Sequence, residues 1–85
     1  MKTYRVSVHI TPRKGILDPQ GKAVEGALHS LGFENVREVH VGRYIVIENE
    51  AQTPEEAKDS VRQMCERLLA NPVIEDFEIE SAAER

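Results

Sequence analysis

Apolar and polar residues alternate over residues 3–11, which predicts a β-strand with one buried face. The apolar positions are Tyr4, Val6, Val8 and Ile10. Alternation returns around Phe77 and Ile79, which predicts the last strand of the chain. Residues 36–41 and 44–48 predict two more strands, joined as a hairpin around Gly42 and Arg43.

A helix is predicted over residues 18–31, because both of its ends are marked in the sequence. Asp18 can accept hydrogen bonds from the first turn, and Pro19 suits the first helical position. Gly32 can take the left-handed conformation that ends a helix, and Phe33 can then fold back on Leu28. The apolar face consists of Ala23, Val24, Ala27, Leu28 and Leu31.

A second helix is predicted to begin after Thr53, because Thr53 and Glu56 form a capping box around Pro54. Asn71 and Pro72 are expected to end this helix. Its apolar stripe consists of Ala57, Val61, Met64, Cys65, Leu68 and Leu69.

The element order β-α-β-β-α-β predicts an α+β fold, a ferredoxin-like sandwich in which two helices cover one face of a four-stranded antiparallel sheet. One domain is expected over residues 1–80, with a frayed tail at 81–85. The strand at 44–47 is apolar on both faces, which predicts that a second chain covers it and that the protein oligomerises through its sheet. The candidate self-association residues are Tyr44, Ile45, Val46 and Ile47.

The composition narrows the functional classes. The chain has 85 residues, a net charge of −4, four residues that are Tyr or Phe and no Trp, which is a poor composition for binding nucleic acid. The sequence contains no run of about 18 apolar residues, so no membrane span is predicted. Cys65 is the only cysteine, so no internal disulfide is possible and a reducing cytoplasm is the expected location.

The charge is unevenly distributed along the chain. Residues 1–43 carry a net charge of +3, and residues 44–85 carry −7. This division can orient subunits against one another, although surface charge without a role is more common.

Catalytic machinery is not evident in the sequence. His9, His29 and His40 have no metal-site spacing, and Cys65 lies on an apolar stripe, which favours an inert core thiol. No serine nucleophile motif and no phosphate-binding loop is present. Lys14 and Lys22 lie near the start of the first helix, where an anion could bind, but Asp18 competes for the same backbone donors.

Two glycines in the first helix need an explanation, because each costs about 0.5–1 kcal/mol relative to alanine. Gly21 and Gly26 allow close approach either by the protein's own sheet or by a partner. We expect the helix start to be exposed and to bind a partner subunit. The candidate interface residues are Lys14, Asp18, Pro19, Gln20, Gly21 and Lys22.

Residues 17–24, continuing through Ala27, Leu28, Leu31 and Gly32, resemble the signature of the PurS family, the small subunit of phosphoribosylformylglycinamidine synthase. A second, supporting match is the stretch from Cys65 to Phe77. With the length and element order, the resemblance extends over nearly the whole chain, whereas residues 34–51 are generic strand sequence.

The resemblance implies a role in purine biosynthesis, within an ATP-dependent ligase complex that converts formylglycinamide ribonucleotide to the amidine. It implies that the large synthetase subunit (PurL) and the glutaminase subunit (PurQ) are partners, bridged by a homodimer or dimer of dimers that assists ammonia transfer. ATP, magnesium and glutamine would bind to those subunits, and this chain would hold no cofactor, metal or active site. The alternatives are a ferredoxin-like regulatory module that binds a small ligand between subunits and, less well supported, an RNA-binding domain.

Overall fold

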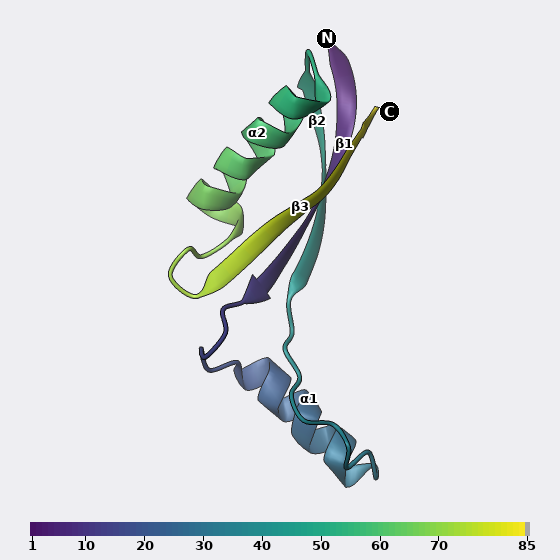
Figure 1. The fold of residues 1–85 in the computed structure, drawn as a ribbon, viewed down its shortest axis with the longest axis vertical. Coiled ribbons are helices and arrows are strands. Elements are labelled where there is room, and N and C mark those ends of the chain that lie inside the picture. Colours follow the sequence, from purple (N-terminus) through teal and green to yellow (C-terminus); the bar gives the residue numbers. More distant parts are fainter. Residues whose placement is uncertain (85) are drawn as a thin grey trace.

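The computed structural model describes residues 1–84 and shows an elongated molecule, 52 × 26 × 14 Å along its principal axes (Figure 1). Three antiparallel strands form one sheet in the order β2-β1-β3. In chain order, the elements are β1 (Lys2–Pro12), α1 (Pro19–Ser30), β2 (Arg43–Ala51), α2 (Pro54–Met64) and β3 (Glu75–Glu84). The fold is therefore α+β with an antiparallel sheet and two helices, consistent with the predicted ferredoxin-like class.

The hydrophobic core lies between the sheet and α2. The predicted apolar face of β1 is confirmed, because Val6, Val8 and Ile10 are fully buried. Val8 pairs with Ile45 of β2 on one side and with Ile79 of β3 on the other, so one apolar layer crosses all three strands. The helix residues that close this layer are Ala57, Val61 and Cys65.

The second helix begins as predicted, with the Thr53 hydroxyl accepting a hydrogen bond from the Glu56 amide at 3.1 Å. Its last turn, Cys65–Leu69, is a π-helix closed by a hydrogen bond from the Ala70 amide to the Cys65 carbonyl at 3.0 Å. Leu68, predicted to lie on the apolar stripe, is 82% exposed. The wider turn changes the angular spacing of the side chains, which accounts for the departure of Leu68 from an α-helical stripe.

The predicted hairpin around Gly42 and Arg43 is wrong. Residues 36–42 are extended but belong to no strand, and β2 begins at Arg43 and pairs with β1. Within residues 1–84 the sheet thus has three strands, not four, and β2 forms one of its edges. Instead of turning back at Gly42, the chain runs straight from the extended segment into β2 (Figure 1).

The first helix does not cover the sheet face, contrary to the prediction of two helices packed on it. We call residues 13–42 the arm; it contains α1 and the extended return segment 36–41, and it projects beyond the end of the sheet (Figure 1). Among the described residues, α1 makes no extensive contact with any strand or with α2. The apolar face of α1 is therefore left uncovered by the sheet of its own chain.

The predicted frayed tail is also wrong for residues 81–84. The strand β3 continues to Glu84, which pairs with Tyr4, after a register irregularity opposite Ser7 and Val8. Arg85 lies outside the described residues. Within residues 1–84, no helix is both long enough and apolar enough to cross a bilayer.

Candidate partner-binding site

The start of α1 has the predicted cap. The Asp18 carboxylate accepts a hydrogen bond from the Gly21 amide at 3.1 Å, and Pro19 occupies the first helical position. The other oxygen of the Asp18 carboxylate accepts a hydrogen bond from the Val41 amide at 2.9 Å. Asp18 therefore connects the return segment to the start of the helix. These two hydrogen bonds hold the pKa of the Asp18 carboxyl below its ordinary value.

Gly21 is buried, which corrects the prediction that it lies exposed at a docking surface. A Cβ atom there would be 2.9 Å from the carbonyl carbon of Val39 and closer still to its oxygen. The return segment crosses the first turn of α1 at this position. Close packing between two segments of this one chain therefore accounts for the glycine at residue 21. Gly26 has open space around its Cα, so the structure gives no reason for glycine there.

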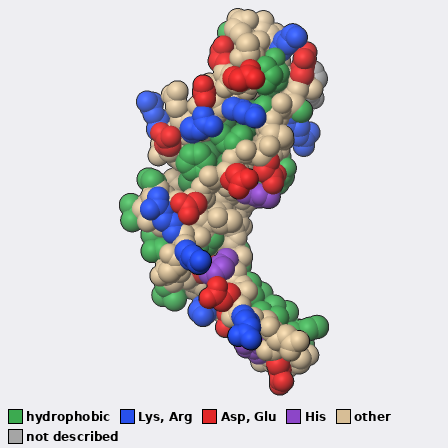
Figure 2. Space-filling view, in the orientation of Figure 1, with side chains coloured by type: hydrophobic (Ala, Val, Ile, Leu, Met, Phe, Trp, Pro, Cys, Tyr) green, Lys and Arg blue, Asp and Glu red, His purple; other side chains and the backbone are tan. Residues whose placement is uncertain are grey.

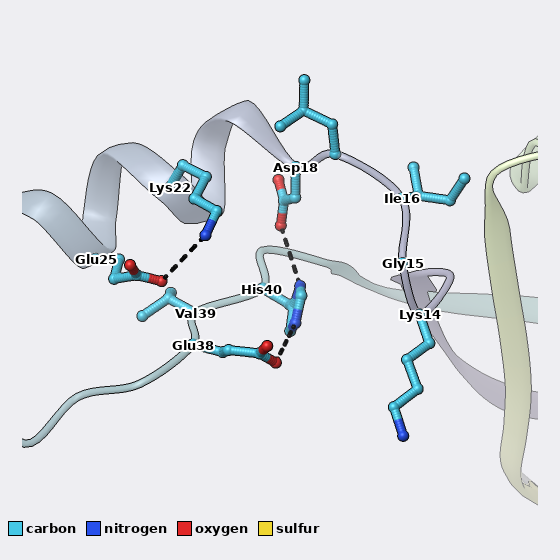
Figure 3. A pocket seen from close by; sticks show the side chains of 10 residues that line it. Lys14, Gly15, Ile16, Asp18, Lys22, Glu25, Glu38, Val39 and His40 are labelled. Carbon is cyan, nitrogen blue, oxygen red and sulfur yellow. Dashed lines mark hydrogen bonds and ion pairs between the residues drawn. The ribbon is translucent and has the colours of Figure 1, made fainter.

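The other candidates surround a cavity of about 380 Å³ at the base of the arm (Figure 3). Lys14 and Lys22 line it, whereas Pro19 and Gln20 are exposed next to it on the first turn of α1. Asp18 lines the same cavity, although its side chain is only 9% exposed. The structure therefore places Lys14, Asp18 and Lys22 around one cavity and leaves Pro19 and Gln20 exposed.

The cavity has mixed charge. Lys22 Nζ lies 3.8 Å from Glu25 Oε1, and the His40 ring lies 3.8 Å from Asp18 and 3.4 Å from Glu38 (Figure 3). The Lys22 ammonium group and the His40 ring therefore each already have an acidic neighbour. The Gly21 amide, a donor that an anion would use, is bonded to Asp18. An anion site here stays a prediction. The Asp18 carboxylate already accepts the hydrogen bond that the Gly21 amide could give to an anion, which is the competition expected from the sequence.

The predicted self-association strand presents different side chains on the two faces of the sheet. Ile45 and Ile47 are half-buried next to the core, on the α2 side. Tyr44 and Val46 are exposed on the opposite face, where the Tyr44 ring lies 4.7 Å from the ring of His9. Both faces of this strand therefore carry accessible apolar surface.

A clasp at the base of the arm was missed in the sequence analysis. Arg43 Nη2 donates to Glu75 Oε1 at 2.6 Å, and Glu75 Oε1 also accepts from the Asn71 amide at 2.7 Å. Arg13 Nε lies 3.3 Å from Asp76 Oδ1, and its backbone amide donates to the Ile74 carbonyl at 2.8 Å. We call this set of contacts the clasp. Its sequence signal was weak, because the adjacent acids Glu75 and Asp76 resemble an ordinary solvated strand start.

The thiol of Cys65 lies in the hydrophobic core. Cys65 is fully buried, as its place on the apolar stripe predicted, and burial raises the pKa of its thiol. Within residues 1–84, no group of three or more His, Cys, Asp or Glu side chains is placed to hold a metal ion.

Comparison with known proteins covers almost the entire chain. Residues 5–83 match the family model described as PurS, phosphoribosylformylglycinamidine (FGAM) synthase. The phosphoribosylformylglycinamidine synthase subunit PurS of Methanocaldococcus jannaschii is 46% identical over 76 residues, which are 89% of this chain and 92% of that protein. The corresponding Bacillus subtilis subunit is 42% identical over 77 residues, which are 91% and 90% of the two chains.

Solved structures share the fold of this chain. A chain in the structure of PurLQS from Thermotoga maritima has a TM-score of 0.85 and 31% identity, with 95% of this chain and 99% of that chain covered. The structure of Thermus thermophilus PurS has a TM-score of 0.82 and 43% identity, with 98% of each chain covered.

Proposed function

This chain belongs to the PurS family, and we propose that it serves as the small, non-catalytic subunit of a phosphoribosylformylglycinamidine synthase in purine biosynthesis. The observation that carries this proposal is the match to a chain of the Thermotoga maritima PurLQS structure, which extends over 95% of this chain. A reducing cytoplasm is the proposed location, and it suits a chain whose single thiol is buried and unpaired.

In the proposed complex, the large synthetase subunit and the glutaminase subunit carry the chemistry. ATP, magnesium and glutamine bind to those two subunits, and the glutaminase releases ammonia that must reach the synthetase site. Free ammonia is protonated and lost in water, so the two sites need a sealed and correctly oriented junction. A small rigid protein can supply that junction by contacts alone.

The base of the arm is the proposed contact surface for one of these subunits. Lys14, Pro19, Gln20 and Lys22 are exposed there. The backbone beneath them is held by the two hydrogen bonds of Asp18. A rigid, exposed helix start can bind a partner without a large loss of conformational entropy. The chain is also proposed to act as a homodimer or dimer of dimers, in which the strand Tyr44–Ile47 takes part.

Reconstitution with the two partner subunits tests this proposal. Gln20→Ala and Lys22→Glu change exposed side chains, so the variants should fold and self-associate as the wild type does. Both should lower glutamine-dependent synthase activity at limiting concentration and leave the ammonia-dependent activity of the large subunit less affected. Ser60→Ala, a small change on α2 away from the arm, is the matched control. Full glutamine-dependent activity in both arm variants would show that this surface is not the contact.

A further inference from the structure

The arm holds together as one rigid unit. At its base, the Asp18 carboxylate accepts hydrogen bonds from both the Gly21 and the Val41 amides, which joins the helix start to the return segment. At its outer end, the His29 ring bonds the Val36 carbonyl at 2.7 Å. Because hydrogen bonds connect them at both ends, α1 and the return segment move together.

The chain joins this unit to the sheet at two points. The arm begins after Pro12, the last residue of β1, and ends before Arg43, the first residue of β2. Among the described residues, α1 makes no extensive contact with any strand or with α2, so packing does not set the angle between the arm and the sheet. A rigid unit held at two points is free to turn about the line between them unless side chains brace it.

The clasp braces both points against the start of β3. At the first point, the Arg13 amide donates to the Ile74 carbonyl at 2.8 Å, and Arg13 Nε lies 3.3 Å from Asp76 Oδ1. At the second point, Arg43 Nη2 donates to Glu75 Oε1 at 2.6 Å. Figure 2 shows basic and acidic side chains next to one another in the middle of the molecule, where the sheet meets the arm. The start of β3 is therefore the reference against which the arm is oriented.

The contact between Arg43 and Glu75 is the stronger of the two ion pairs in the clasp. The Arg13 and Asp76 side chains are 48% and 66% exposed, and an ion pair between exposed side chains contributes little. The Glu75 side chain is 20% exposed, and its Oε1 also accepts from the Asn71 amide at 2.7 Å, which holds the carboxylate in place independently of Arg43. A short, charge-assisted hydrogen bond to a fixed carboxylate is both strong and directional.

We propose that Arg43 and Glu75 are positioning residues, whose contact fixes the direction in which the arm leaves the sheet. The fixed direction presents the contact surface at the base of the arm to the partner subunit in one orientation. Binding is then more favourable, because the arm does not have to be ordered at that moment. This assignment rests on the proposed function and deepens it by naming what orients the contact surface. Neither residue belongs to that surface, and both act through the arm.

Two arginine-to-glutamine substitutions give a matched pair of variants. Arg43→Gln removes the cationic group from the clasp and leaves the hydrogen bond between Asn71 and Glu75 intact. Arg37→Gln makes the same change on the return segment, outside the clasp. Both arginines are exposed, so both variants should retain the wild-type circular dichroism.

Distances between two spin labels measure the direction of the arm. The labels are attached at Ser30→Cys, at the end of α1, and at Glu78→Cys, on β3; both positions are exposed, whereas the native Cys65 is buried. Labelled chains are diluted with unlabelled chains, so that only distances within one chain are recorded. Pulsed electron spin resonance should give one narrow distance distribution for the wild type and for Arg37→Gln, and a broader one for Arg43→Gln.

Titration of the unlabelled chain into the two partner subunits measures the consequence for binding. For Arg43→Gln, the chain concentration that gives half-maximal glutamine-dependent turnover should rise about 3- to 10-fold, because the arm must then be ordered on binding. Turnover at saturation should equal that of the wild type, since the contact surface itself is unchanged. Arg37→Gln should match the wild type in both quantities.

A distance distribution for Arg43→Gln as narrow as that of the wild type would overturn the proposal. So would an unchanged half-maximal concentration, and so would a lower turnover at saturation. Failure of the wild type to support glutamine-dependent turnover is a different result, because it would refute the proposed function and the role in presentation together. The spin-label distances would then still decide whether the clasp fixes the arm.

Discussion

Replacing Gly21 by alanine tests whether the return segment lies on the first turn of α1. In a free helix, this substitution would be favourable by about 0.5–1 kcal/mol, because alanine is the better helix former. In this chain, the new Cβ would be 2.9 Å from the Val39 carbonyl carbon and 2.5 Å from Asp18 Oδ2. Both separations are shorter than the 3.4 Å at which ordinary van der Waals contact begins. The return segment would have to move away.

Such a movement also strains the hydrogen bond from the Val41 amide to Asp18, which is 2.9 Å long. Overpacking against backbone typically costs about 1–3 kcal/mol. Subtracting the gain in helix propensity leaves a range of about 0–2.5 kcal/mol, and from its centre we expect the arm to lose about 1.3 kcal/mol of local stability. A loss of that size corresponds to roughly tenfold more opening. Gly26→Ala is the matched control, because nothing lies near its Cα, and it should stabilise α1 by about 0.5–1 kcal/mol.

Amide hydrogen exchange of Ala27 and Leu28 measures the opening of α1 directly. Exchange at these amides should be faster than in wild type for Gly21→Ala and slower for Gly26→Ala. The sheet amides of Val6 and Val8 serve as an internal reference and should change little. If both alanine variants protect α1 to the same extent, the return segment does not pack on the first turn, and the account of the arm fails.

Three further results are expected from the same geometry. Because Ile10 is fully buried, Ile10→Ala should lower the free energy of unfolding by about 2–5 kcal/mol and Ile10→Val by about 0.5–1.5 kcal/mol. Urea denaturation measures both effects, and equal effects would place Ile10 outside the core. The lowered pKa of Asp18 means that its contribution to arm stability is complete above the ordinary aspartate pKa of about 3.9 and is lost as the pH falls through the lowered pKa. Acid should therefore lower the protection factors of the Gly21 and Val41 amides in wild type, that is, the intrinsic exchange rate at each pH divided by the observed rate, and an unchanged pH dependence of these protection factors in Asp18→Asn would refute this. Cys65 should react with a thiol reagent at pH 8 only after unfolding, because its sulfur is buried and its thiol pKa is raised; rapid labelling of the folded protein would contradict that.

The sequence predicted the elements whose signals are local. Caps at Asp18 and Thr53 are short-range hydrogen bonds, and both occur in the structure. Gly32 ends α1 with a positive φ of 100°, and the Phe33 amide bonds the Leu28 carbonyl at 3.0 Å. The buried face of β1 followed from simple alternation, and the three-dimensional structure adds only which strands pair with it.

The arrangement of the arm could not be predicted, because alternation does not say which strand a segment pairs with. Residues 36–41 have a strand pattern, but they lie along α1, where Asp18 binds the Val41 amide. Gly42 was assigned to a tight turn, yet a Cβ there would collide with the Ile10 carbonyl, so it allows two backbones to pass closely. The clasp joins Arg43 to Glu75, two residues far apart in the chain, and local patterns carry no information on such a contact.

Omission of this chain from a reconstituted synthase tests the central claim most directly. The two partner subunits would be assayed for conversion of formylglycinamide ribonucleotide with ATP, using either glutamine or ammonium as the nitrogen source, with and without this chain. The account predicts that glutamine-dependent turnover requires this chain and that ammonium-dependent turnover by the large subunit persists without it. Full glutamine-dependent turnover in its absence, or an equal loss with both nitrogen sources, would contradict a bridging role in ammonia transfer.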